Sequence, residues 1–142
     1  MKYFFDTNII IDLCQNKEEA KNIFKEIALL KESEIFVNRL VVLESLRTIH
    51  YRHSKRFRDA VKILDVFETV NIKHEIYDEA IIFSRYCHSK GIKLKGKCEA
   101  IDFLHFITAK YYNLVMISND KDLEKLENIY INFMELNKET IV

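Results

Sequence analysis

The sequence predicts an α/β protein with a central parallel sheet and helices on both of its faces. Short apolar runs of β-branched and aromatic residues alternate with longer segments whose apolar residues recur at helical spacing. That alternation is typical of parallel strands joined by right-handed helical crossovers. The chain has no Pro and only two Gly, so few residues interrupt its helices. At 142 residues it is expected to form one domain, residues 1–142.

Five runs are predicted to be strands, and the first, 3–5, begins almost at the first residue. The run 114–117 is the next clearest buried strand, and the remaining three are 34–38, 70–72 and 129–133. Helices are predicted over 9–15, 17–31, 39–52, 54–69, 78–88 and 98–113, with a further helix starting near 120. Gly91 is expected to end the helix before it, and 92–97 to form an exposed basic loop.

Composition excludes several classes of protein. The 22 basic and 22 acidic residues cancel, so net charge neither predicts nor excludes nucleic-acid binding. Cys14, Cys87 and Cys98 are odd in number and widely spaced, which argues against a disulfide framework or a zinc site and fits a reducing cytoplasm. We expect no signal peptide and no membrane span.

Two acidic positions directly follow apolar strands. Asp6 comes after the first strand, where open α/β sheets place their ligands, although it could equally be only a helix cap. Thr7 and Asn8 behind it either cap the helix or orient the carboxylate. Asp120 holds the same position after 114–117, with Ser118 before it. Asp120 is favoured over Asp122 as the acid facing the cleft, and the other would cap the helix.

Two further acids interrupt apolar helices. Glu44 shares a helical stripe with Leu40 and Leu43, which predicts that it lies on or beside the buried face. Asp102 stands in the apolar segment 100–107, and its alternatives are exposure to solvent or an ion pair with Lys110. A buried carboxylate is costly unless it is paired, hydrogen-bonded or bound to a metal.

Four acids from four separate elements would repel one another if the fold brought them together. A hard divalent cation relieves that repulsion, and oxygen-only ligands suit Mg²⁺ or Mn²⁺. The predicted ligands are Asp6, Glu44, Asp102 and Asp120 or Asp122.

These motifs resemble the PIN-domain nucleases. The resemblance rests on four segments: residues 4–8, residues 42–46 with Glu44, residues 100–105 with Asp102, and residues 118–120. It covers essentially the whole chain. Length and motif order are similar to the VapC-type toxins of prokaryotic toxin–antitoxin pairs. The resemblance implies an α/β/α sandwich and Mg²⁺-dependent cleavage of RNA. The mechanistic hypothesis is then an in-line attack by water on the phosphodiester, with Glu44 or Asp120 orienting the water or accepting its proton. It also implies Asp6 and Asp102 as the main metal ligands, and an antitoxin as partner. Ser118 and Leu123 depart from the family pattern, where many members have Thr and Phe, which leaves the fourth acid open.

Substrate binding requires basic groups near these acids. Lys93, Lys95 and Lys97 are favoured because they precede the Asp102 segment, and Arg39 and Arg47 flank Glu44. The run 52–58 is a further candidate, although all of these side chains could simply be solvated. A homodimer is also consistent with the sequence.

Three alternatives to a nuclease differ in class. A PIN-like module that binds RNA or protein without catalysis would keep the fold, but all four acids are present. A haloacid dehalogenase-type phosphatase requires a second Asp where this chain has Asn8. A receiver-like domain requires a phospho-acceptor Asp after the third strand, where residues 71–74 of this chain contain none. Both are disfavoured.

Overall fold

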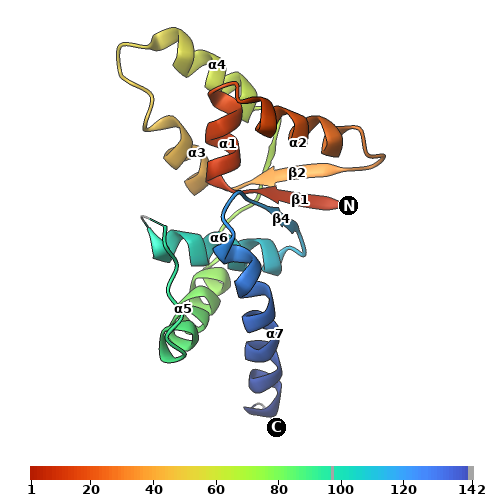
Figure 1. The fold of residues 1–142 in the computed structure, drawn as a ribbon, viewed down its shortest axis with the longest axis vertical. Coiled ribbons are helices and arrows are strands. Elements are labelled where there is room, and N and C mark those ends of the chain that lie inside the picture. Colours follow the sequence, from red (N-terminus) through yellow and green to blue (C-terminus); the bar gives the residue numbers. More distant parts are fainter. Residues whose placement is uncertain (97, 141–142) are drawn as a thin grey trace. The chain divides into compact units, whose positions relative to one another are not determined.

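The computed structural model describes residues 1–96 and 98–140, with no account of the side chains of 138–140. The chain divides into two compact units, which are described separately (Figure 1). The first comprises Met1–Asn71 and Tyr112–Asn119, and the second comprises Ile72–Tyr111 and the residues from Asp120 on. The single domain therefore stays a prediction. None of the described helices combines the length and the apolar character that crossing a membrane requires.

The first unit contains the sheet. Its strands are β1 (Lys2–Phe5), β2 (Glu34–Val37), β3 (Glu68–Thr69) and β4 (Val115–Ile117), in the order β3-β2-β1-β4. Every neighbouring pair is parallel, which confirms the predicted parallel α/β fold. β1 is one of the two inner strands, and its register sets Phe4 beside both Phe36 and Met116. Phe4 and Phe5 are fully buried, as an inner parallel strand requires.

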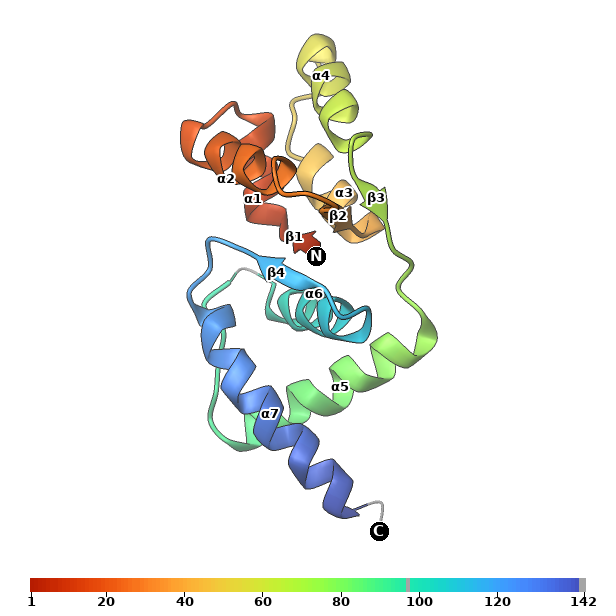
Figure 2. The same ribbon diagram turned by 90° about the vertical axis from the view of Figure 1, so that its right-hand side faces the viewer.

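Four helices complete the first unit, and they lie on one side of its sheet (Figures 1 and 2). They are α1 (Thr7–Cys14), α2 (Glu18–Ala28), α3 (Arg39–Leu46) and α4 (Ser54–Leu64). α1 packs against the other three. Its buried face carries Ile9, Ile10 and Leu13, which recur at helical spacing. An aromatic contact closes the core, because the ring of Phe67 lies 5.7 Å from Phe5 and 5.8 Å from Phe24.

Two predicted helices in this unit are too long. The helix from Arg39 ends at Leu46 rather than near residue 52, because most side chains of 47–53 are exposed and offer no packing face. The next helix ends at Leu64, and the third strand is Glu68–Thr69 rather than 70–72. Pairing of these two residues with β2 outweighs helical continuation, and the Val70 N–H also donates to the Val37 carbonyl at 2.9 Å.

The second unit is a helical cluster of α5 (His74–Ser89), α6 (Glu99–Tyr111) and α7 (Asp122–Thr140). Its centre is the fully buried Phe83, whose ring lies between 5.2 and 5.8 Å from four other rings: Phe103, Phe106, Tyr130 and Phe133. α5 begins four residues before the predicted 78, since 74–77 already form its first turn.

The predicted final strand, 129–133, is wrong because these residues belong to α7. Leu123, Leu126 and Phe133 are buried, and their spacing of three and seven residues places them on one helical face. Ile131 contributed to the apparent strand but is 53% exposed. A short apolar run did not distinguish a strand from part of an amphipathic helix.

The predicted role of Gly91 is confirmed. Gly91 has φ +71°, and its N–H donates to the His88 carbonyl while the Ile92 N–H donates to the Cys87 carbonyl. This pair of bonds is the Schellman motif, which satisfies the last carbonyls of α5 and favours Gly at the left-handed position.

Gly91→Ala should lower the free energy of unfolding by about 1–2 kcal/mol, because an L-residue is strained at this φ. Added steric contact does not contribute, since a Cβ at Gly91 would meet no atom within 4 Å. Urea unfolding measures the effect, and Gly91→Asn is the matched control because Asn tolerates the left-handed region better. Equal stability of the Ala variant and the native chain would contradict the strain argument.

Candidate functional site

Polar side chains follow three neighbouring strands of the sheet at the edge where each strand ends. Asp6 follows β1, Asn38 follows β2 and Ser118 follows β4. Asp6 is 5% exposed and Asn38 is fully buried. The carboxyl edge of a parallel sheet is the usual place for a ligand, because the loops and helix N-termini converge there.

Asp6 is held by hydrogen bonds from several parts of the first unit. Its Oδ1 accepts the Thr7 N–H at 2.8 Å, and its Oδ2 accepts the Ser118 hydroxyl at 2.8 Å and the Asn8 amide at 3.5 Å. Asp6 is also the N-cap residue of α1, so the simpler interpretation of Asp6 as a helix cap is correct. A cap alone does not account for the burial of the carboxylate or for its contact with Ser118.

Glu44 is linked to Asp6 through Thr7. The Thr7 hydroxyl donates to Glu44 Oε1 at 2.8 Å, while the Thr7 N–H donates to Asp6. Glu44 is half-buried on α3, but the predicted stripe is wrong in part, since Leu43 is 58% exposed. The buried side chains of α3 are Val41 and Ser45, so Glu44 lies at the margin of the packed face.

A second set of hydrogen bonds ties the end of β4 to α1. The Asn8 amide donates to Ser118 Oγ at 3.1 Å, and Asn8 Oδ1 accepts the Asn119 N–H at 3.1 Å. The Asn119 amide donates to Asp12 at 2.9 Å, and Lys17 pairs with Asp12 at 3.1 Å. Sequence reasoning missed Asp12, Asn119 and also Asn38, whose Oδ1 caps α3. A polar residue directly after an apolar strand was the available signal for Asn38.

Asp102 lies in the second unit, half-buried on α6. Gly96 approaches it closely, because a Cβ at Gly96 would lie 2.2 Å from Asp102 Oδ2. The absence of a side chain at residue 96 is therefore a condition for this carboxylate position. Lys110, the alternative partner for Asp102, forms an ion pair with Glu127 of α7.

Asp120 and Asp122 have different surroundings at the start of α7. Asp120 Oδ1 accepts the Asp122 N–H at 2.9 Å, so Asp120 caps the helix. The prediction that Asp122 would be the cap is wrong, because Asp122 already lies in the first turn of α7. Asp122 Oδ2 accepts the Lys95 N–H at 3.0 Å and so holds the 92–96 loop against α7. Each acid thus has a local structural task, and the choice between them as a metal ligand stays a prediction.

The basic loop is anchored while its charges stay in solvent. Lys93 and Lys95 are exposed, whereas Leu94 between them is 7% exposed. Glu99 accepts the Leu94 N–H at 2.8 Å and also contacts His88 at 2.9 Å. Lys97, the third predicted cation, lies outside the described residues.

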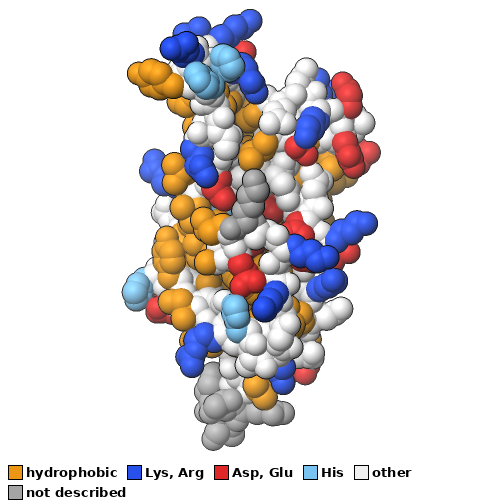
Figure 3. All heavy atoms as spheres, turned by 60° about the vertical axis from the view of Figure 1, so that its left-hand side comes forward, with side chains coloured by type: hydrophobic (Ala, Val, Ile, Leu, Met, Phe, Trp, Pro, Cys, Tyr) orange, Lys and Arg blue, Asp and Glu red, His pale blue; other side chains and the backbone are white. Residues whose placement is uncertain are grey.

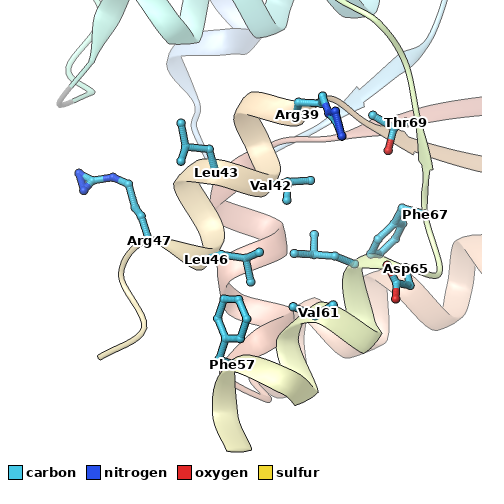
Figure 4. Close-up of a pocket in the computed structure, with 11 residues that line it drawn as sticks. Arg39, Val42, Leu43, Leu46, Arg47, Phe57, Val61, Asp65, Phe67 and Thr69 are labelled. Atoms are coloured by element: carbon cyan, nitrogen blue, oxygen red, sulfur yellow. The ribbon is translucent and has the colours of Figure 1, made fainter. Parts of the chain in front are cut away.

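Arg39 and Arg47 are exposed on and just after α3 and border a groove of about 650 Å³ between α3 and α4, called here the α3–α4 groove. Its lining is mostly apolar, and Val42, Leu46 and Phe57 point into it (Figure 4). The remaining lining residues are Leu43, Val61, Leu64, Asp65, Phe67 and Thr69. An apolar groove with cations at its rim suits an amphipathic segment of a protein partner.

Two of the three thiols, those of Cys14 and Cys87, do not favour metal binding. Burial, followed by the charge of Glu99, raises the pKa of Cys87 to about 11, and burial also raises the pKa of Cys14. Both thiols therefore stay protonated near neutral pH, whereas a metal ligand must be a thiolate. Among the side chains that the structure describes, those of 1–96 and 98–137, no three His, Cys, Asp or Glu are grouped so as to hold a metal. A preformed cage is not required for Mg²⁺, which is usually bound by one or two carboxylates together with water and substrate phosphates.

Comparison with known proteins places this arrangement in a family. The family model described as the PIN domain matches residues 3–129. No curated protein sequence matches the chain.

Several solved structures share its fold. A chain of VapBC2 from Rickettsia felis, solved with a promoter DNA fragment, is 17% identical with a TM-score of 0.73, covering 88% of this chain and 92% of that one. A chain of VapBC-1 from Haemophilus influenzae is 18% identical with a TM-score of 0.70, and the match covers 90% of this chain and 94% of that one. VapC20 from Mycobacterium tuberculosis, a toxin that cleaves the sarcin–ricin loop, is 14% identical with a TM-score of 0.65. The match covers 87% of this chain and 94% of that one.

Removing the Ser118 hydroxyl should destabilise the first unit. In Ser118→Ala the buried Asp6 carboxylate loses a donor, and hydrogen bonds to charged groups contribute roughly 1–3 kcal/mol. Urea unfolding should show a loss in that range. Ser89→Ala is the control, because Ser89 is an exposed serine that donates to a backbone carbonyl, and its loss should be clearly smaller. Equal effects of the two substitutions would contradict a special role for the Asp6 contact.

Proposed function

This chain belongs to the PIN-domain family, and from that premise we propose that it is a metal-dependent endoribonuclease acting as the toxin of a type II toxin–antitoxin pair. The observation that carries the proposal is the buried Asp6 carboxylate at the carboxyl end of β1, held by donors from α1 and from the end of β4. The similar VapBC and VapC20 folds support a toxin of this type.

The donor chemistry around Asp6 fits Mg²⁺ or Mn²⁺. The Asp6 carboxylate lies beside the Ser118 hydroxyl and is linked through Thr7 to the Glu44 carboxylate, so oxygen atoms are the ligands at hand. Hard divalent cations prefer such oxygen ligands. We assign Asp6 and Asp102 as ligands, with Glu44 and Asp120 completing the set and Asp122 as the alternative to Asp120. When bound, the ion would lower the pKa of a coordinated water and neutralise charge on the phosphate.

Other residues of the first unit orient the carboxylates and the attacking water. Ser118 and Asn8 fix the Asp6 carboxylate, and Thr7 fixes Glu44 relative to it. Glu44 is half-buried and accepts the Thr7 hydroxyl at Oε1, and we assign it the task of orienting a water or accepting its proton. Asp120 is the alternative residue for that task. Arg39, Arg47, Lys93, Lys95 and Lys97 would hold backbone phosphates, which positions RNA without reading its sequence.

An antitoxin protein is the proposed partner, and we assign it the α3–α4 groove. The groove is lined mainly by apolar side chains, including Val42, Val61 and Phe67, and it has Arg39 and Arg47 at its rim. An amphipathic helix with acidic flanks fits that combination. The groove begins on α3, which also carries Glu44, so an occupant there would contact the helix that holds this acid.

The alternative function is a PIN-like module that binds RNA or protein without cleaving it. The Thr7 contact with Glu44 favours catalysis, because a binding module has no need to orient a half-buried acid beside a buried one. RNA binding without any cleavage in Mg²⁺ or Mn²⁺ would favour the alternative.

Asp6→Asn and Asp102→Asn should each abolish cleavage of a mixed set of labelled RNAs in Mg²⁺ or Mn²⁺, because an amide cannot replace a carboxylate as an anionic ligand. EDTA should abolish cleavage by the native chain. Circular dichroism checks folding, and Asp78→Asn on the exposed face of α5 is the matched control that should cleave normally. Cleavage by both site variants at the native rate would refute the assignment.

Thr7→Val should raise the Mg²⁺ concentration that gives half-maximal cleavage by roughly 10- to 100-fold, the usual effect of removing a group that orients a ligand. Val keeps the shape of Thr but cannot donate to Glu44. Thr7→Ser restores the hydroxyl and should restore most of the metal dependence. If Val and Ser behave alike, the hydroxyl does not act through Glu44.

A further inference from the structure

The segment between α3 and α4 concentrates positive charge in a chain of zero net charge. From Arg47 to Arg58 there are five Arg or Lys residues and two His, and no acid stands between Glu44 and Asp59. Arg and Lys side chains gather with His over α4 and the segment before it (Figure 3). A local excess of this size attracts polyanions even when the net charge is zero.

The same segment forms a second groove of about 840 Å³, called here the tip groove. Its lining includes Arg47, His50 and Arg58, the hydroxyls of Thr48 and Ser54, and the rings of Tyr51 and Phe57, but no acid. Leu46 and Ile49 complete the lining. Cations, hydroxyl groups and aromatic faces together are the groups that bind phosphate and nucleobases.

Tyr51 is the least expected member of this lining. It is 99% exposed, so its ring contributes nothing to the core, and Phe57 beside the groove is 45% exposed. Hydrogen bonds fix the turn that carries it, since the His53 N–H donates to the His50 carbonyl at 2.8 Å and the Arg52 N–H donates to His50 Nδ1 at 3.1 Å. The ring is therefore presented to solvent by an ordered turn.

We propose that the tip groove binds single-stranded RNA, with an unpaired base stacked on Tyr51. Phosphates would be held by Arg47 and Arg58, which line the groove, and by Arg52 in the turn that carries Tyr51. The inference rests on the proposed nuclease function and names the part of the substrate that the chain holds. Glu44 and Arg47 are three residues apart on and just after α3, so a strand in the groove passes within about one helical turn of Glu44.

The chemistry of the groove favours RNA over an acidic protein segment. Leu46, Arg47 and Phe57 line both grooves, but the tip groove adds a second arginine, a histidine, two hydroxyls and the exposed ring of Tyr51. It has no acid, whereas the α3–α4 groove includes Asp65. Stacking on an exposed ring is sequence-tolerant and requires unpaired bases, so duplex RNA should not use Tyr51.

The absence of Trp from the chain allows a direct test, because Tyr51→Trp introduces a single fluorescent reporter. Titration with a single-stranded RNA dodecamer in EDTA, where no cleavage occurs, should quench its fluorescence. A duplex of the same sequence should not. Tyr77→Trp on α5 is the matched control, since Tyr77 is 44% exposed in the other unit, and its fluorescence should stay constant.

Binding of a fluorescein-labelled dodecamer, followed by anisotropy, tests the energetics. Tyr51→Ala should weaken binding about 5- to 150-fold and Tyr51→Phe by less than that, since the ring face carries the interaction. Replacing Arg47, Arg52 and Arg58 together by Gln should reduce the slope of log K against log salt by about 2.

Quenching by single strands together with the Ala effect supports the proposal. Unchanged fluorescence of the Tyr51→Trp variant, together with native affinity of Tyr51→Ala, overturns it, as does failure of the native chain to bind the dodecamer. Quenching by poly-glutamate but not by RNA also overturns it and makes the groove a site for an acidic protein. Because these readouts need no metal and no cleavage, they are independent of the outcome for the nuclease.

Discussion

The burial of one carboxylate is the constraint on which the first unit depends. Asp6 ends an inner strand of the sheet and is almost fully removed from solvent. An isolated buried carboxylate would be strongly unfavourable, so the surrounding chain must supply donors. It does so from α1 through Thr7 and Asn8, and from the end of β4 through Ser118. The β1–β4 register is what brings residues so distant in sequence to the same carboxylate.

This constraint explains why small polar residues occupy both strand ends. Ser118 accepts from Asn8 and donates to Asp6, so one hydroxyl serves two contacts. Thr7 uses its N–H for Asp6 and its hydroxyl for Glu44, which couples the positions of two acids through one residue. Such hydrogen bonds orient carboxylates before any ligand arrives, so little reorganisation is required on binding. The proposed chemistry therefore depends on this pre-organisation as much as on the acids themselves.

Much of this arrangement could be predicted from the sequence, because the strands are short apolar runs and the acids stand out against apolar neighbours. Thr7, Asn8 and Ser118 were candidates, and each contacts Asp6 or Glu44. The helix at 129–133 could not be distinguished from a strand, since a short apolar run fits both periods. The ends of α3 and α4 depend on packing and strand pairing, which local sequence does not determine. Nor could the roles of Asp120 and Asp122 be separated, because one caps a helix and the other holds a loop distant in sequence.

The central claim is that Asp6 anchors a divalent cation, and anomalous diffraction tests it most directly. Crystals of the chain soaked in Mn²⁺ would be measured at the manganese absorption edge. The account predicts an anomalous peak roughly 2.1 Å from an Asp6 carboxylate oxygen, the distance typical of Mg²⁺ ligands, and no such peak in Asp6→Asn. A Mn²⁺ peak elsewhere with none at Asp6, or a peak at the same place in Asp6→Asn, would contradict the claim.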